Sequence, residues 1–408
     1  MKILLVAEVS ITQVNSGAER VLREQAVGLA ARGHEVRILT RMGTDGEPAR
    51  IVVGEISETR YAVSRRNAVS FVLSTLQNAK RAWASLVRED PPDVIVVHQA
   101  LPGLAILHRS VKTPLAYMCL SLAHEEFEAR NSSPANIWGW IWYYCHSRAR
   151  QWTERTVMRR ARRIIVLSDF IRKSVETCHR VAGDRIRIIP GGADVGRFSP
   201  VPDHKSVRAA LGLREKEFVL FTLRNLEPRM GLQALIQAMA LARRTIPHLR
   251  LLIGGSGLLQ PMLEALVKTM GLEDCVRLLG FIPEALLPDY YRAADLFVLP
   301  TTRLEGFGLV TIEALASGTP VFGTRVGATD EILRNLDPAL LSERTDPESM
   351  AAGISALYRR FLADSNARPR LAEAGRALVL RDYTWARHCE RVEEVLVEAC
   401  GSQQEAHR

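Results

Sequence analysis

The chain has 408 residues, of which 47% are hydrophobic and 24% are charged. These fractions are typical of globular proteins and exclude collagen-like, disordered and integral-membrane chains, while the length predicts two or three domains of about 150 residues. The 54 Lys and Arg exceed the 45 Asp and Glu by 9, which favours anionic partners such as nucleotides, phosphates or acidic lipids.

The N-terminal residues MKILLVAEVS predict a first β-strand rather than a signal peptide, because Glu8 interrupts a short apolar run and no cleavage site follows. No apolar run reaches the roughly 18 residues that a membrane-spanning helix needs. The six cysteines form no CxxC pair, so neither a disulfide framework nor a zinc site is expected. We therefore expect a cytoplasmic location.

Short apolar runs alternate with helix-length segments along the whole chain, which predicts parallel sheets built from βαβ units. The expected strands lie at residues 3–9, 36–40, 93–98, 114–120 and 163–168, then at 218–223, 249–255, 276–281, 295–300 and 320–324.

A cluster of Pro and Gly near residues 190–202 interrupts this pattern and predicts a linker. We expect an α/β fold of two doubly wound, Rossmann-like domains, 1–192 and 193–380, that face each other across a cleft. A helix in 381–408 is expected to return to the first domain. In such folds ligands bind at the carboxyl ends of the strands.

The stretch DLFVLPTTRLEGFGLVTIEALASGTPV is the most informative one. It places a loop with Glu305 between a predicted strand and a helix that starts near Gly308 and carries Glu313. Free amides at a helix start can bind a phosphate. The two carboxylates can accept hydrogen bonds from hydroxyls at different ends of one ligand.

Two arginines follow the predicted strand 218–223, at Arg224 and Arg229. Guanidinium groups there can stabilise a departing diphosphate, which many nucleotide enzymes achieve with a metal. No Asp-x-Asp pair stands at a strand end, so we expect no metal site and no cofactor. The glycines of LLIGGSG, including Gly255, also follow a strand, although a tight turn is the better interpretation of them taken alone. The segment SGAER around Gly17 follows the first strand and can bind the donor phosphate or the acceptor, with a helix cap as the alternative.

The motifs SGAER, RIIVLSDFIRKSV, IIPGGADVGRFSP, RNLEPRMG, LLIGGSG, GFIPEALLPDYYRAADLFVLPT, EGFGLVTIEALASGTPV and GATDEIL occur in this order. In these motifs the chain resembles the family 4 glycosyltransferases of the GT-B fold over nearly its whole length. The resemblance implies transfer of a sugar from a nucleotide-diphosphate donor to a hydroxyl acceptor, with retention of configuration.

The resemblance also implies roles for individual residues. Glu305 would contact the donor sugar, Glu313 the ribose, and Arg224 and Arg229 the diphosphate. The backbone around Phe281 and Ile282 would hold the base. The implied donor-binding residues are Gly17, Gly255, Phe281, Ile282, Gly306, Phe307, Gly308, Leu309 and Glu313.

The sequence departs from the family pattern at two positions. Met230 stands where relatives usually have Lys, and the adjacent Arg229 is expected to supply the charge. Leu120 stands where many members have a His near the donor sugar. His124, four residues later, is the candidate replacement; otherwise the donor differs or the activity is weak.

Candidate acceptor residues in the first half are His98, which ends a predicted strand, and Glu125 and Glu126 in the loop 124–131. A lone histidine at a strand end is more often structural, and a solvated acidic loop is at least as good an interpretation of residues 124–131. Glycan, lipid-linked and small-molecule acceptors all stay open.

Aromatic and basic residues lie side by side in SRRNAVSFVLSTLQNAKRAWASLVRED and WGWIWYYCHSRARQWTERTVMRRARRI. Such a combination suits peripheral contact with anionic lipid at the inner face of a membrane. The alternative is that the aromatic residues belong to a core or an acceptor cleft and that the arginines form a solvated helix face. No motif supports nucleic-acid binding.

Three functions fit the sequence. The leading one is a metal-independent retaining hexosyltransferase that uses a UDP-sugar, since no carboxylate specific for guanine is apparent. A nucleotide-sugar epimerase on the same fold is the second. The third is a degenerate binding or partner subunit, which Leu120 motivates.

Overall fold

The computed structural model describes residues 1–14, 16–44, 46–107, 113–131, 134, 136–201 and 203–405. It divides the chain into two compact units. Unit 1 consists of Met1–Glu128, Ser133–Gly191 and Trp385–Arg408, and unit 2 consists of Ala129–Ser132 and Gly192–Thr384. The second unit is therefore contained within the sequence of the first.

Unit 1 is built on one eight-stranded sheet in the order β3-β4-β2-β1-β5-β6-β7-β8. All neighbouring strands are parallel except the edge pair of β3 and β4. Strand order reverses between β1 and β5, which makes this the topological switch point. The strands are β1 (Lys2–Val6), β2 (Glu35–Arg41), β3 (Arg50–Val53), β4 (Ile56–Tyr61), β5 (Val94–Val97), β6 (Leu115–Cys119), β7 (Arg163–Val166) and β8 (Ile186–Ile188).

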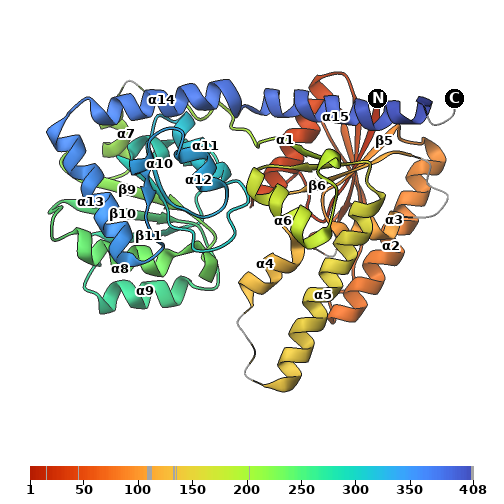
Figure 1. The fold of residues 1–408 in the computed structure, drawn as a ribbon, viewed down its shortest axis with the longest axis horizontal. Helices are drawn as coiled ribbons and strands as arrows, with labels where there is room; N and C mark the ends of the chain where they lie inside the picture. The colour runs from red at the N-terminus through yellow and green to blue at the C-terminus, as the bar shows by residue number, and fades with distance from the viewer. Residues whose placement is uncertain are drawn as a thin grey trace. The chain divides into compact units, whose positions relative to one another are not determined.

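Helices lie against this sheet, and α3 packs against both α2 and α5 (Figure 1). They are α1 (Gly17–Ala31), α2 (Ala68–Glu89), α3 (Ala100–Ile106), α4 (Ala123–Arg130), α5 (Ile137–Arg160), α6 (Asp169–His179) and α15 (Trp385–Glu405).

Unit 2 has a six-stranded parallel sheet in the order β11-β10-β9-β12-β13-β14, with its switch point between β9 and β12. The strands are β9 (Phe218–Leu223), β10 (Leu249–Gly254), β11 (Val276–Gly280), β12 (Leu296–Leu299), β13 (Val321–Thr324) and β14 (Leu341–Ser342). The helices are α7 (His204–Ala210), α8 (Leu232–Ala242), α9 (Gln260–Thr269), α10 (Leu287–Ala293), α11 (Leu309–Ala316), α12 (Ala328–Leu333), α13 (Pro347–Ala363) and α14 (Ala367–Asp382).

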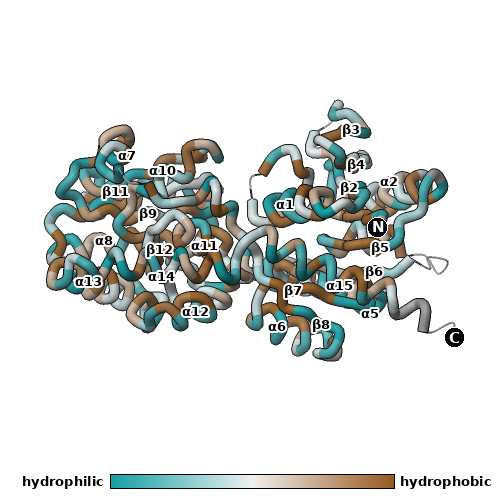
Figure 2. The backbone as a smooth tube through the Cα atoms, turned by 90° about the horizontal axis from the view of Figure 1, so that it is seen from above, coloured by the Kyte–Doolittle hydropathy of each residue, from teal (hydrophilic) through white to brown (hydrophobic). Residues whose placement is uncertain are grey.

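The ten strands expected from apolar runs are all present. Figure 2 shows β5, β6 and β7 as hydrophobic segments, and their side chains are buried because helices cover the sheet. The sequence did not predict β3, β4, β8 and β14. No helix among the described residues is long and apolar enough to cross a membrane.

The C-terminal helix α15 belongs to unit 1. Its apolar face buries Trp385, Cys389, Val392 and Leu396. It also forms polar contacts with the first helix and the turn after it: Gln25 Nε2 lies 2.8 Å from His388 Nε2, and His34 Nε2 lies 2.7 Å from Glu393 Oε1.

Candidate functional site

Three loops of unit 2 leave the carboxyl ends of neighbouring strands at the switch point. The loop after β9 carries Arg224 and Arg229, the loop after β10 carries Gly255, and the loop after β12 carries Glu305. Open α/β sheets bind their ligands at this place. The fold therefore brings together residues that are up to 81 positions apart in the sequence.

Arg224 and Glu305 form a buried ion pair at the centre of these loops. Arg224 Nη2 donates to Glu305 Oε2 over 2.6 Å and to Thr301 Oγ1 over 3.1 Å. The Thr301 hydroxyl in turn donates to Glu305 Oε2 over 2.8 Å. Met230, at the position of the usual Lys, lies beside the pair, with its Sδ 2.8 Å from Arg224 Nη2. Glu305 thus holds the Arg224 guanidinium at the edge of the sheet.

Close backbone contact holds the β10 loop against the β9 loop. Gly255 has φ +118°, and a Cβ there would lie 1.9 Å from the carbonyl oxygen of Arg224. Its amide donates to the Gly280 carbonyl over 2.8 Å. Gly255 therefore acts in packing, as the interpretation of LLIGGSG as a tight turn predicts.

Arg229 braces the loop that precedes Glu305. Its Nη1 donates to the carbonyl oxygen of Leu304 over 2.8 Å. Leu304 itself has φ +57°, a left-handed conformation that a branched side chain rarely adopts. Such strain persists only where the surroundings enforce it, and here it sets the backbone next to Glu305.

Helix α11 begins directly after Gly308 and holds Glu313 in its second turn. Glu313 is 3% exposed, and its Oε2 accepts a hydrogen bond from the Tyr291 hydroxyl over 2.9 Å. Gly306 and Leu309 are partly buried. Phe307 is buried with its ring 5.8 Å from that of Tyr383, so its side chain is a core residue.

The two residues expected to hold the base differ in exposure. Phe281 is 59% exposed and Ile282 is 7% exposed. Ile282 packs toward the end of β10, because a Cβ at Gly254 would lie 2.5 Å from Ile282 Cδ1.

Gly17 and His98 lie after the two switch-point strands of unit 1. Gly17 is the first residue of α1, and the Ser16 amide donates to Glu19 Oε2 over 2.5 Å, which caps this helix. His98 follows β5 and is 4% exposed. Burial, together with repulsion from His388, lowers the pKa of His98 to about 3. The buried imidazole is therefore neutral at physiological pH.

His124 belongs to a buried cluster in unit 1 with Glu154 and His179. Glu154 Oε2 lies 3.0 Å from His179 Nε2 and 4.0 Å from His124 Nδ1, and its Oε1 accepts from the Tyr117 hydroxyl over 3.2 Å. Burial alone would raise the pKa of Glu154, but the two imidazoles and the Ala123 amide outweigh it and lower that pKa.

The acidic candidates beside this cluster are paired within unit 1. Glu125 Oε1 lies 3.8 Å from Cys178 Sγ, and Glu126 Oε1 accepts from the Ser121 hydroxyl over 2.6 Å. Burial raises the pKa of Glu125. Among the described residues, two sets have donor atoms close enough to hold a metal ion: His124, Glu154 and His179, and His124, Glu125 and Cys178.

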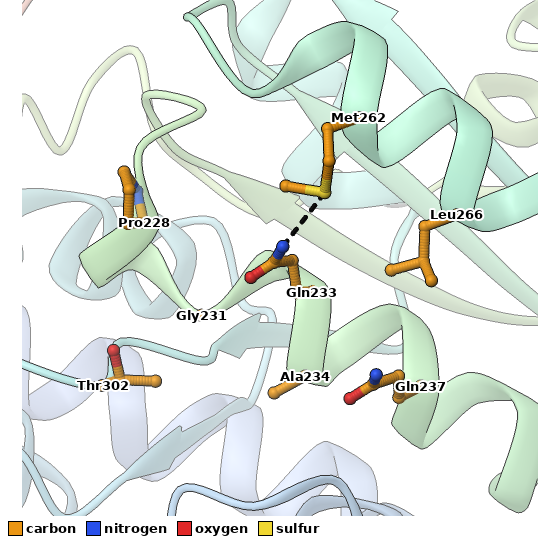
Figure 3. A pocket seen from close by; sticks show the side chains of 8 residues that line it. All are labelled: Pro228, Gly231, Gln233, Ala234, Gln237, Met262, Leu266 and Thr302. Carbon is orange, nitrogen blue, oxygen red and sulfur yellow. Dashed lines mark hydrogen bonds between the residues drawn. The ribbon is translucent and has the colours of Figure 1, made fainter. Parts of the chain in front are cut away.

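A pocket of about 410 Å³ adjoins the Arg229 loop between α8 and α9 (Figure 3). Gln233 Nε2 points across it to Met262 Sδ at 3.0 Å. No candidate site residue lines this pocket, whose walls are Pro228, Gly231, Gln233, Ala234, Gln237, Met262, Leu266 and Thr302.

Sequence reasoning did not find several residues that support the candidates. Thr301 orients Glu305, Tyr291 contacts Glu313, and Glu154 contacts His124 and His179. Gly327, the first residue of the motif GATDEIL, is a further supporting residue. It packs against the loop of Glu305, because a Cβ at Gly327 would lie 2.0 Å from the Glu305 carbonyl oxygen. Tyr291 and Thr301 lie within the motif GFIPEALLPDYYRAADLFVLPT, which did not single them out, and Glu154 has no distinguishing local pattern.

Comparison with known families gives matches to both halves of the chain. The model for glycosyl transferases group 1 matches residues 203–378, and the model for Glycosyltransferase Family 4 matches residues 15–197.

Three relatives show how much of the chain is shared. A D-inositol 3-phosphate glycosyltransferase of Nocardia farcinica is 32% identical over 90% of this chain and 81% of its own length. Its counterpart in Segniliparus rotundus is 37% identical, but the match spans 42% of this chain and 39% of the relative. A GDP-mannose-dependent alpha-(1-6)-phosphatidylinositol monomannoside mannosyltransferase of Mycolicibacterium smegmatis is 31% identical over 51% of this chain and 55% of its own length.

Solved structures share the fold at lower identity. Sucrose-phosphate synthase from Thermosynechococcus elongatus has a TM-score of 0.84 at 23% identity and covers 98% of this chain and 100% of its own. Anabaena HepE in complex with UDP has a TM-score of 0.73 at 19% identity, covering 98% of this chain and 100% of its own. The chain therefore belongs to the family 4 glycosyltransferases, enzymes of the GT-B fold.

Proposed function

We propose that this enzyme transfers a hexose from a nucleotide-diphosphate donor to a hydroxyl acceptor with retention of configuration and without a metal ion. The observation that carries the proposal is the buried pair of Arg224 and Glu305 at the strand ends of unit 2. It provides a fixed positive charge for the departing diphosphate beside a carboxylate that can bind sugar hydroxyls.

The proposed reaction is a front-face displacement. The bond between the anomeric carbon and the diphosphate oxygen breaks, and the acceptor oxygen bonds to the same face of the sugar. The acceptor proton passes to the departing phosphate oxygen, so no separate base is required. Arg224, Arg229 and the amides at the start of α11 stabilise the negative charge that develops on the diphosphate.

The donor is proposed to be a UDP-sugar. One structural neighbour was solved with UDP, and Phe281 offers an exposed ring beside the predicted base position. A GDP-sugar is the alternative, because one relative is named as GDP-mannose-dependent.

The acceptor and the location are proposed together. Two relatives are named for D-inositol 3-phosphate and one for a phosphatidylinositol mannoside, so both soluble and lipid-linked hydroxyls fit. We propose a cytoplasmic enzyme that works at the inner face of the membrane. Free cysteines throughout the described residues suit a reducing compartment.

The test is nucleotide release from a panel of UDP- and GDP-sugars in EDTA, with wild type, Glu305→Ala and Leu120→His compared. We expect slow hydrolysis of one UDP-sugar by the wild type and at least a hundredfold loss in Glu305→Ala. The Thr302→Ser variant, next to the site but outside its hydrogen-bond network with Arg224, is the control.

Two results would contradict the proposal. If turnover stops in EDTA and returns when a divalent cation is added, the reaction requires a metal ion and this part of the proposal is wrong. Donor binding without any turnover, with activity restored by Leu120→His, would favour the degenerate partner subunit instead.

A further inference from the structure

Helix α5 exposes a set of large apolar side chains, most of them in its first half. We call it the α5 apolar face, and it consists of Ile137 (67% exposed), Trp138 (77%), Trp140 (48%), Ile141 (48%), Trp142 (51%), Tyr144 (62%) and Trp152 (60%). Four of the six tryptophans of the chain lie on it. For these side chains of α5 the interpretation as core residues is therefore wrong, while a place in an acceptor cleft stays a prediction.

The exposed residues form one continuous side of the helix. At about 100° per residue, their positions cover on the order of 200° of the helix circumference. In Figure 1 the first turns of α5 extend away from the sheet of unit 1. An ordinary surface helix turns its apolar side to the core, whereas α5 has the opposite arrangement over this half.

The inward side of the same turns is firmly anchored. Phe127 of α4 packs against Tyr143 and His146 on this side, with ring centroids 5.3 and 6.0 Å away. Its ring also lies 5.8 Å from that of Trp142, which is half-exposed at the edge of the apolar face. Arg150 lies over the Phe127 ring at 4.3 Å. The Ser147 hydroxyl donates to Glu128 Oε1 over 2.6 Å. The orientation of the apolar face is therefore fixed by packing within unit 1.

The first turns of α5 themselves carry only positive charge, although the neighbouring α4 carries Glu125, Glu126 and Glu128. No acidic residue occurs between Ile137 and Thr153, while Arg148, Arg159 and Arg160 are exposed on the helix. Arg148 also lies over the Tyr144 ring at 5.9 Å.

We propose that the α5 apolar face binds the interfacial region of an anionic phospholipid bilayer. Trp and Tyr favour this region because their rings are apolar and their N–H and O–H groups remain near water. The arginines match the negative surface of such a bilayer, which a neutral protein partner would not require. The inference rests on the membrane location proposed above and assigns the surface responsible for it.

The test is flotation of the full chain with vesicles of phosphatidylglycerol and phosphatidylcholine, against phosphatidylcholine alone, without nucleotide sugar. We expect binding to anionic vesicles at least tenfold stronger than to neutral ones, and quenching of tryptophan fluorescence by brominated lipid. In Trp138→Gln/Trp140→Gln/Trp142→Gln, binding should fall at least tenfold and the quenching should be mostly lost.

The matched control is Leu362→Gln/Leu380→Gln, which removes two exposed apolar side chains (68% and 47%) from helices of unit 2 and should bind like the wild type. Circular dichroism confirms that each variant folds. Equal binding by the triple variant, or no binding by the wild type, overturns the proposal. A wild-type dimer that the triple variant abolishes, without vesicle binding, assigns the face to a second copy.

Lipid binding is measured without donor, so it is independent of the proposed transfer reaction. If the protein binds vesicles but transfers no sugar, the membrane-binding surface is confirmed and the proposed transfer function is wrong. If the protein transfers sugar to a soluble acceptor but does not bind vesicles, the transfer function stands and the membrane-binding surface is wrong.

Discussion

Arg224 and Glu305 are each less than a tenth exposed, so their charges are taken out of water and compensated by each other. A buried pair of this kind contributes little net stability, whereas the loss of one partner leaves an uncompensated charge. The pair therefore acts mainly to position the two side chains and contributes little to the stability of the fold. This role accounts for a carboxylate next to a group that is proposed to bind phosphate.

Two buried histidines of unit 1 should make its stability sensitive to acid. Burial, together with repulsion from His388, lowers the pKa of His98 to about 3. Burial also lowers the pKa of His388 to about 4. An unfolded histidine titrates near 6.5, so between these values the unfolded chain binds more protons than the folded one. Stability is then highest above pH 6.5 and falls as the pH decreases.

For His98→Leu we expect the decrease in unfolding free energy between pH 6.5 and 5 to be about 2 kcal/mol smaller than in the wild type. Urea unfolding at pH 7, 6 and 5 measures this difference. Val97→Ala, at the adjacent buried position, is the control, because it removes packing without removing a titrating group. Parallel pH profiles for wild type and His98→Leu would contradict the assignment.

At the scale of elements, the contact between the β9 and β10 loops should be sensitive to a single methyl group. Gly255→Ala places a Cβ against the Arg224 carbonyl, at 1.9 Å in the present backbone, so the loop that carries Arg224 must move. We expect a loss of about 2–4 kcal/mol in stability and at least a tenfold loss in donor turnover.

Gly271→Ala is the matched control for this prediction. Gly271 also has a positive φ, +61°, but a Cβ there has nothing within 4 Å. It should cost about 1 kcal/mol and leave turnover unchanged. Similar turnover in the two variants would show that the close contact does not position Arg224.

The strands could be predicted where an apolar run is buried on both faces, as in β5 and β12. The edge hairpin was missed, because β3 is short and mostly exposed, and its three β-branched residues Ile51–Val53 do not form the longer buried run of a central strand. The same limit applies to α5. Its composition predicts either a core or a surface helix, and only its packing against Phe127 decides which side faces outward.

The candidate site was predicted in part. Motifs located Arg224, Glu305 and Glu313, since each follows a strand or opens a helix in a recognisable pattern. The cluster of His124 with Glu154 and His179 combines three separate helices. No local spacing predicts such a contact, and the proposed role of His124 near the donor sugar remains a prediction.

For the whole molecule, the two units should respond differently to loss of the C-terminal helix. Removal of residues 385–408 takes away Trp385, Cys389, Val392 and Leu396, which are buried in unit 1. We expect unit 1 to unfold or become protease-sensitive, and unit 2 to remain resistant. Limited proteolysis with mass spectrometry identifies the protected fragment.

Removal of residues 401–408 is the control for this truncation, because the buried positions of α15 up to Ala399 are retained. It should leave both units protected. Equal sensitivity of the two units to the longer truncation would show that they do not fold independently.

The place of α15 also determines when each unit can be completed on the ribosome. Unit 2 is nearly one continuous segment, Gly192–Thr384, so it can close before the last helix leaves the exit tunnel. Gly28 of α1 packs so tightly on Cys389 that a Cβ would lie 2.4 Å from its Sγ. Until residues 385–405 are synthesised, this side of α1 lacks its cover. The first unit in the sequence is therefore the last to be finished, which reverses the usual N-terminal-first order of folding during synthesis.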